Sequence, residues 1–246
     1  MTMTKDAKIS IITPLYNCKR YLQRFLTNVE LIENFDLANL MLIYCGDDEE
    51  ELEMLRECNR KHYNVFLYTP DYMTLYESWN WAVQRAASPY VINSNVDDLI
   101  NPTILYSIVM ELENGADIVY GNNIVVTDLD TTWQNFTLED SLIYPSSQFS
   151  ISKMLRGNLI HNCVAWNLAI HEDVGYFDTS LRTASDYEFW LRVATAGKKI
   201  VYMPDTFSLY YYNPCGISTD VNTATTKILE EIRVQNKYRK LIGDKK

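Results

Sequence analysis

The first 120 residues alternate short apolar runs with stretches whose apolar residues recur every three or four positions. Apolar runs bounded by polar or turn residues are typical of strands buried on both faces. The stretches between them have the period of amphipathic helices, as Leu75, Trp79 and Val83 illustrate. This alternation predicts an α/β fold with a mostly parallel sheet covered by helices on both sides. The expected strands are 8–16, 40–45, 64–69 and 89–95, and the expected helices are 18–34, 49–61 and 74–87.

The pattern changes after Gly115. A helix is expected over 102–115, with Pro102 at its first position. Long strand-like runs and a looser region follow. No linker rich in Pro, Gly or Ser and no internal repeat interrupts the chain, so we expect one domain over residues 1–246. Its remaining elements are expected at 117–130 (strand), 185–197 (helix), 199–204 and 207–212 (strands) and 223–243 (terminal helix).

Composition narrows the classes of function. The net charge of −10 argues against broad nucleic-acid binding, which needs a basic surface. The five cysteines are widely spaced and form no CxxC pair, which is typical of reduced thiols in a cytoplasmic protein. The start of the chain enters a strand pattern without the apolar core of a signal peptide, and no apolar run is long enough to cross a bilayer.

Acidic residues gather where the predicted strands end. In an open parallel sheet, ligands bind beyond the carboxyl ends of the strands. Residues 13–17, 45–48 and 95–98 are expected there, and they bring four aspartates to one edge. Carboxylates so near to one another repel unless their charge is compensated. Mg²⁺ or Mn²⁺ would suit their oxygen atoms and would also bind a diphosphate. No glycine-rich phosphate loop is present to hold a diphosphate instead.

The acidic pair Asp97–Asp98 also has a simpler interpretation. It precedes the helix expected from Pro102, so its charge could serve only the helix dipole. The pair alone leaves both interpretations open.

Longer motifs favour the ligand site. ISIITPLYN, LYESWNWAVQRAASPYVINSNVDD, VGYFDTSLRTASDYEFWLRVATAGKKI and YYYNPCGIS, in this order and spacing, resemble the family 2 glycosyltransferases over residues 9–218. The resemblance implies a GT-A fold and an inverting enzyme that moves a sugar from a nucleoside-diphosphate sugar, most simply a UDP-sugar, to a glycan or lipid-linked acceptor. It also implies a donor-binding half over about 1–120, an acceptor-binding half over about 121–220, and a C-terminal helix and tail from about 221.

The resemblance also assigns site residues. Asp186 matches the general base, and Asp97 matches the ligand of Mn²⁺ or Mg²⁺. Residues 210–218 would close over the diphosphate. Trp133, His161, Tyr212 and Ser218 are candidates for acceptor or loop contacts. The residues implied in nucleotide-sugar binding are Thr13, Pro14, Tyr16, Asn17, Cys45, Asp47, Asp48, Asn80, Asn95, Asp97 and Asp98.

Four positions depart from the family pattern. Cys45 stands in place of an aspartate, Trp79 in place of an arginine, Asn95 in place of the first DxD aspartate, and Ser185 in place of a glutamate. These departures leave open a protein that binds a nucleotide sugar or glycan without turning it over. Asp186 could likewise be only a helix-start residue beside a capping Ser185.

Two further features remain open. IVVTDLDTT fits the phosphoaspartyl signature of haloacid dehalogenase phosphatases, with Asp128 as nucleophile, but no later strand supplies a second acidic pair, and a hairpin turn is the simpler interpretation. The terminal helix combines an apolar face with basic residues. It either packs on its own domain or rests on an anionic membrane. The basic residues are Lys237, Arg239, Lys240, Lys245 and Lys246.

Overall fold

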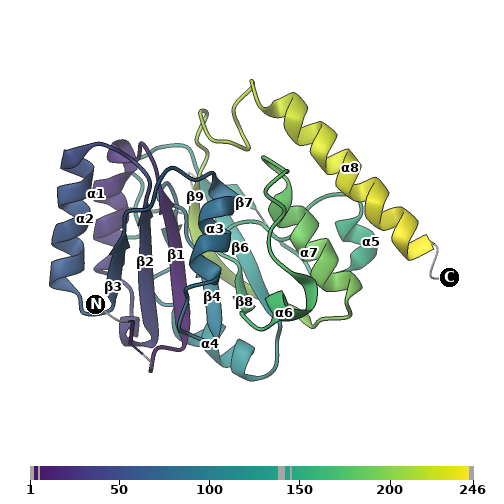
Figure 1. Cartoon of the computed structure of the whole chain (residues 1–246), viewed down its shortest axis with the longest axis horizontal. Coiled ribbons are helices and arrows are strands. Elements are labelled where there is room, and N and C mark those ends of the chain that lie inside the picture. Colours follow the sequence, from purple (N-terminus) through teal and green to yellow (C-terminus); the bar gives the residue numbers. More distant parts are fainter. Residues whose placement is uncertain (1–2, 5, 138–141, 145, 244–246) are drawn as a thin grey trace.

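One twisted sheet forms the centre of the molecule, with helices on both faces (Figure 1). The computed structural model describes residues 3–4, 6–137, 142–144 and 146–243. The strand order is β3-β2-β1-β4-β8-β6-β9-β5, and β7 pairs with β6. The strands are β1 (Ile9–Leu15), β2 (Ala38–Tyr44), β3 (Val65–Tyr68), β4 (Tyr90–Asn93), β5 (Leu99–Ile100), β6 (Ile118–Val126), β7 (Leu142–Tyr144), β8 (Ala165–Asn167) and β9 (Ile200–Tyr211).

The predicted parallel half is confirmed. β3, β2, β1 and β4 run parallel to one another, and β8 joins β4 in the antiparallel sense. The helices are α1 (Lys19–Val29), α2 (Glu49–Lys61), α3 (Leu75–Val83), α4 (Leu105–Glu113), α5 (Ile151–Met154), α6 (Ile170–Val174), α7 (Ser185–Thr195) and α8 (Ala224–Gly243), with a 3₁₀ turn at Phe35–Leu37.

The core has two layers because neighbouring residues of a strand face opposite sides of the sheet. Ile11 of β1 packs in the layer under α1, α2 and α4, whereas Ile12 packs in the layer that contains residues of α3, α7 and α8. Trp166 and Trp190 are fully buried in this second layer, as expected of core tryptophans. The five cysteines are free thiols, as predicted.

The structure differs from the sequence-based expectation at β9 and at the start of α4. The two strands expected at 199–204 and 207–212 form the single strand β9, because irregular pairing with β6 absorbs the extra residues around Pro204. Pro102 is not the first residue of α4, which begins at Leu105. The short strand β5 separates Asp98 from that helix, so the acidic pair does not serve the α4 dipole.

The terminal helix buries a different face from the one that its sequence pattern indicates. α8 lies along α7 at one side of the molecule (yellow in Figure 1), where Val234 and Tyr238 are its buried residues. The apolar residues that mark its expected face are instead exposed, namely Ile228, Leu229, Ile232 and Leu241. Lys245 and Lys246 lie outside the described residues. In the part of the chain that the structure describes, no helix is both long and apolar enough to span a membrane.

Candidate active site

Asp98 is enclosed at the turn between β4 and β5. Its Oδ2 accepts a hydrogen bond from Asn162 Nδ2 at 2.6 Å, and its Oδ1 accepts one from the Tyr211 backbone N–H at 3.0 Å. Burial, together with the neighbouring Asp97, raises the pKa of Asp98 well above its usual range. Because both carboxylate oxygens are engaged within the chain, Asp98 ties this turn to β9.

Asp97 lies beside it and is only half-buried. Its Oδ2 accepts a hydrogen bond from Asn213 Nδ2 at 3.1 Å, and burial raises its pKa. Its backbone carbonyl accepts from Arg24 of α1 at 2.9 Å, and the same guanidinium donates to Thr131 O at 2.9 Å. Asp98 and Asp97 oppose the effect of burial on the Arg24 pKa, so this cation partly compensates the acidic pair. No sequence motif marks Arg24.

The buried polar atoms near this turn that have no hydrogen-bond partner among the described residues include Asn95 Oδ1, Thr13 Oγ1 and Ser94 Oγ. A buried polar atom without a partner destabilises a fold by about 1–3 kcal/mol. Thr13 belongs to β1, while Ser94 and Asn95 follow β4, the adjacent strand. Their positions at the carboxyl edge fit a polar ligand that would bond to them.

The loop after β1 brings aromatic side chains to the same edge. Tyr16 is 52% exposed, and its ring meets Tyr72 edge-on, with ring centroids 5.1 Å apart. Asn17 adopts a left-handed backbone with φ 48°, a conformation that asparagine tolerates better than most residues. Pro14 is the half-buried residue of β1 that precedes this loop. Tyr72 follows β3 and was not predicted as a site residue.

Other predicted donor residues have clear partners within the chain. Asp48 is the N-cap of α2 and accepts hydrogen bonds from the backbone N–H groups of Glu50 and Glu51. Asn80 pairs with the backbone of Phe177 through both its amide nitrogen and its amide oxygen, at 2.9 Å each. Burial raises the pKa of the half-buried Cys45 thiol. Asp47 is exposed. Their roles toward a donor stay predictions.

Asp186 stands in the first turn of α7 and is held by two other elements. Tyr76 of α3 donates its hydroxyl to Oδ1 at 3.0 Å, and Asn158 Nδ2 lies 3.4 Å from Oδ2. Burial raises the pKa of Asp186 to about 6, although the Tyr187 backbone N–H and Tyr76 lower it. A carboxyl group with a pKa near the working pH is suited to general-base catalysis.

Ser185 does not cap α7. The N-cap is Ala184, which makes no side-chain capping bond, and Ser185 is the first helical residue. Its hydroxyl is buried and has no partner among the described residues. Asp186 is therefore not accompanied by the serine cap that its sequence context suggested.

One short segment connects the two acidic centres. Asn158 contacts Asp186, and Asn162, four residues later, binds Asp98. Four residues span at most about 14 Å. The structure therefore brings the acidic turn and Asp186 to the same region, although 88 positions separate residues 98 and 186 in the sequence. Neither asparagine was predicted, since no motif marks them.

The residues predicted for acceptor or loop contacts have varied surroundings. Trp133 is half-buried and donates its indole N–H to Leu99 O at 3.3 Å. Burial lowers the pKa of His161 to about 4. Tyr212 is 49% exposed, and the backbone carbonyl of the exposed Ser218 accepts from Lys227 at 3.3 Å. Which of them meets an acceptor stays a prediction.

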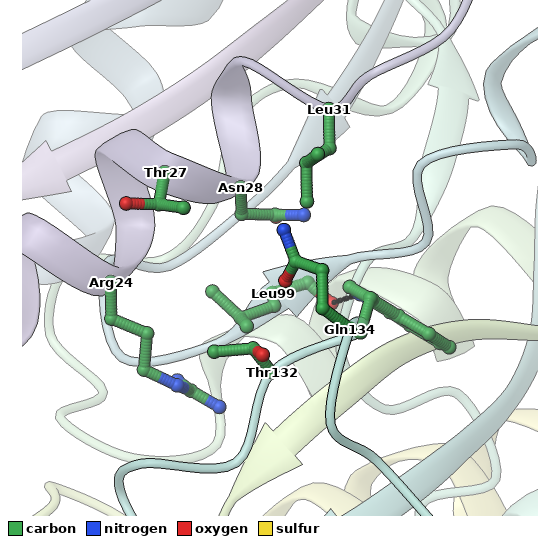
Figure 2. A pocket seen from close by; sticks show the side chains of 8 residues that line it. Arg24, Thr27, Asn28, Leu31, Leu99, Thr132 and Gln134 are labelled. Carbon is green, nitrogen blue, oxygen red and sulfur yellow. Dashed lines mark hydrogen bonds between the residues drawn. The ribbon is translucent and has the colours of Figure 1, made fainter.

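A hollow beneath the loop that carries Trp133 is not a ligand site. Figure 2 shows Arg24, Thr27 and Asn28 of α1, with Leu31 from the turn that follows it, facing Leu99, Thr132 and Gln134. The space between them leaves no room for a water-sized sphere.

The phosphatase-like motif lies in the loop that carries Trp133. There Asp128 accepts a hydrogen bond from the Asp130 backbone N–H at 3.0 Å, which is typical of a local turn and not of a phosphatase centre. The surrounding β6–β7 connection joins antiparallel strands, as a hairpin does.

The described residues supply only part of the ligand set of a divalent cation. In the described segments no three His, Cys, Asp or Glu side chains gather as a ligand set. Asp97 is half-buried and offers a hard oxygen donor, whereas both oxygens of Asp98 are engaged within the chain. The chain therefore fits a cation that a ligand's own oxygens would help to hold.

Residues 10–174 match the sequence family described as Glycosyl transferase family 2, which is two thirds of the chain. The chain belongs to glycosyltransferase family 2. This result supports the resemblance drawn from the motifs, and it leaves the phosphatase interpretation without support.

Curated relatives of this family 2 chain are longer proteins. Chondroitin synthase from Escherichia coli is 24% identical over 208 residues, which cover 80% of this chain and 28% of that protein. Hyaluronan synthase from Pasteurella multocida is 23% identical over 197 residues, which cover 77% of this chain and 19% of that protein. The chain thus spans less than a third of these relatives.

Solved structures share the fold of the family 2 chain. S. aureus TarS 1–349 in complex with UDP-GlcNAc matches with a TM-score of 0.68 at 15% identity, over 89% of this chain and 69% of that one. The mannosyltransferase PcManGT from Pyrobaculum calidifontis, in complex with GDP-Man and Mn²⁺, matches with a TM-score of 0.64 at 14% identity, over 95% of this chain and 67% of that one. The predicted GT-A fold is confirmed.

Proposed function

We propose that this chain transfers a sugar from a nucleoside-diphosphate sugar, in the first instance a UDP-sugar, to a hydroxyl of a glycan or lipid-linked acceptor, with inversion. The observation that carries the proposal is the pairing of two acidic centres through one segment. Asn158 and Asn162 link Asp186, whose pKa is about 6, to the acidic turn at Asp97 and Asp98. A displacement at an anomeric carbon needs both a base and a place for the leaving diphosphate.

In this mechanism Asp186 accepts the proton of the acceptor hydroxyl while that oxygen attacks the anomeric carbon. The new carbon–oxygen bond forms as the bond from the anomeric carbon to the diphosphate breaks, and the electron pair leaves with the nucleoside diphosphate. Attack from the face opposite the leaving group inverts the configuration. Tyr76 and Asn158 hold the carboxylate of Asp186 in place for this step.

The leaving group would lie at the acidic turn. Asp97 is the proposed ligand of Mn²⁺ or Mg²⁺, and a bound cation would supply charge neutralisation for the departing diphosphate. Asn95 Oδ1 and Thr13 Oγ1, buried without partners among the described residues, are proposed acceptor atoms for donor hydroxyl groups. Tyr16 and Tyr72 offer aromatic surface for the base. In this proposal residues 1–120 bind the donor and 121–220 the acceptor.

Donor turnover tests the proposal. The protein is incubated with Mn²⁺ and separately with UDP-GlcNAc, other UDP-sugars and GDP-mannose, and released nucleoside diphosphate is measured with water as acceptor. We expect release from at least one donor, dependent on Mn²⁺ and lowered by about two to four orders of magnitude in Asp186→Asn. Binding of a donor in a thermal-shift assay without any release would favour the non-catalytic alternative.

A further inference from the structure

The N–H groups of the loop that leads into α7 converge on one carboxylate of α8. Glu230 Oε1 accepts the backbone N–H of Arg182 at 2.8 Å. Its Oε2 accepts the backbone N–H groups of Thr183 and Ala184 at 2.8 and 3.1 Å, and the Thr183 hydroxyl at 2.7 Å. Four hydrogen bonds from three consecutive residues thus end on one side chain. Asp186 follows two residues after this loop.

These bonds replace a local cap. α7 has no side-chain capping bond at Ala184, and Glu230 lies 46 residues further along the chain than Ala184. Burial alone would raise the pKa of Glu230, but the N–H groups of the loop keep it below its usual value. The side chain is therefore ionised at neutral pH. A negative charge at a helix N-terminus also interacts favourably with the helix dipole.

A second contact, two turns further along α8, fixes the two helices together. Glu188 of α7 is 3% exposed and accepts hydrogen bonds from Lys237 Nζ and the Tyr238 hydroxyl, both at 2.7 Å. Arg192 binds the other oxygen of Glu188 at 2.6 Å. α8 is thereby attached at the start of α7 and again one turn along it. Figure 1 shows the two helices side by side.

The same region of α8 lies within electrostatic range of Asp186 and its partner. The charge of Glu231 contributes to the raised pKa of Asp186, and the charge of Glu230 contributes to the raised pKa of Tyr76. Both carboxylates therefore act on the Tyr76–Asp186 pair through their charge. The other groups that face Asp186 are Asn158 and the Tyr187 backbone N–H.

We infer that Glu230 is a positioning residue for the transfer reaction: it fixes the 182–184 loop and so sets where the Asp186 carboxylate stands. This inference rests on the proposed role of Asp186 as base. Tyr76 and Asn158 hold the carboxylate end of Asp186, while Glu230 holds the backbone that carries it. A displacement of about 1 Å in a reacting group lowers rates by up to about 10²-fold.

The first test needs no substrate. Hydrogen exchange is compared between wild type and Glu230→Gln, whose amide nitrogen cannot accept the loop N–H groups. We expect faster exchange at 182–186 in the variant and unchanged exchange in β1 and β2. Glu113→Gln is the matched control, since Glu113 makes a partly exposed ion pair with Lys8 at 2.9 Å. Unchanged exchange at 182–186 would refute the contact and the inference with it.

The second test separates positioning from general stability through a double-mutant cycle with nucleoside-diphosphate release from UDP-GlcNAc, or the donor that the panel identifies. In the wild-type background, Glu230→Gln is expected to lower kcat by about tenfold or more, while the donor KM stays within about twofold. In the Asp186→Asn background, the same substitution is expected to lower kcat by less than about twofold further. Lys237→Gln removes one of the two hydrogen bonds by which α8 holds Glu188 and serves as the control for helix attachment.

These measurements distinguish a failure of the Glu230 inference from a failure of the proposed role of Asp186 as base. An equal loss from Glu230→Gln with and without Asp186, or a loss matched by Lys237→Gln at equal stability, would make Glu230 a purely structural residue. Full activity of Asp186→Asn would instead refute the proposed base. In that case the exchange experiment still decides whether Glu230 holds the loop.

Discussion

The hydroxyl of Tyr76 donates a hydrogen bond to Oδ1 of Asp186 at 3.0 Å, across 110 positions of sequence. Tyr76 is 5% exposed and lies in the first turn of α3, which follows β3. The bond therefore joins the parallel half of the sheet to the helix that carries the proposed base. It also stabilises the charged form of a carboxylate that burial would otherwise protonate more readily.

Tyr76→Phe should raise the pKa of Asp186 above about 6, because it removes a donor to the carboxylate. A hydrogen bond to a charged group contributes about 1.5–3 kcal/mol, which corresponds to about 1–2 pH units. Since the base acts when deprotonated, the acidic limb of the pH–rate profile should move to higher pH, with more activity lost at pH 6 than at pH 8. The phenyl ring keeps the packing against Trp79 and Phe177. A uniform loss at every pH would contradict this prediction.

Asp186→Asn should lower transfer by about two to four orders of magnitude, the usual contribution of general-base catalysis. The donor affinity should stay near that of the wild type, because Asp186 acts on the acceptor hydroxyl. Thermal shift with the donor measures affinity, and single-turnover rates measure the chemistry. A variant that fails to fold, or that keeps most of its rate, would indicate a structural role for this carboxylate.

Asp97→Asn should remove the Mn²⁺-dependent part of UDP binding. Asparagine keeps the size of the side chain but lacks the charge that a divalent cation favours. The readout is the rise in melting temperature that UDP causes with and without Mn²⁺. Asp128→Asn, in the exposed turn after β6, is the matched control and should behave like the wild type. Equal UDP binding in the wild type with and without Mn²⁺ would contradict the assignment.

His171 should make the fold sensitive to mild acid. Its Nε2 accepts the Trp166 indole N–H at 2.9 Å, and burial lowers its pKa to about 4. The unfolded chain binds this proton near pH 6.5, so the stabilisation is complete above that pH and is lost as the pH falls toward 4. Asp186, whose pKa is raised, acts in the opposite direction. The difference in urea midpoint between wild type and His171→Gln should therefore shrink from pH 7 to pH 5; a constant difference would contradict the prediction.

α8 should bind weakly to anionic vesicles. Its exposed residues include apolar Ile228, Leu229 and Ile232, and its exposed charges are basic within the described residues 224–243. Each basic residue near an anionic surface contributes about 1 kcal/mol, and salt screens this attraction. Co-sedimentation should fall at high salt and in Arg233→Glu with Lys240→Glu, but not in Lys8→Glu. A protein that stays in the supernatant at low salt would rule out membrane contact through α8.

The periodicity of the sequence was sufficient for the parallel strands and their helices, because these elements are buried on well-defined faces. It failed where tertiary contacts decide. A break at Pro204 suggested two strands, yet pairing with β6 continues β9 past it. The face that Ile228 and Ile232 mark on α8 is exposed, whereas Val234 and Tyr238 are buried.

The candidate site was likewise only partly predictable from the sequence. Asp97 and Asp186 stand in motifs with recognisable spacing. Asn158, Asn162 and Glu230 bind those regions from distant parts of the chain, and their residue types occur in many loops and helices. Local sequence alone cannot identify such partners, because only the fold brings them together.

The attachment of α8 defines how much of the chain works as one unit. The family match ends at residue 174, before α7 begins. A fragment cut there would keep Asp97 and lack Asp186. A fragment cut before α8 would keep Asp186, but the N–H groups of residues 182–184 would lose the acceptor that Glu230 provides. The smallest unit able to hold both acidic centres in place therefore extends through Tyr238, well beyond the segment by which the family is recognised.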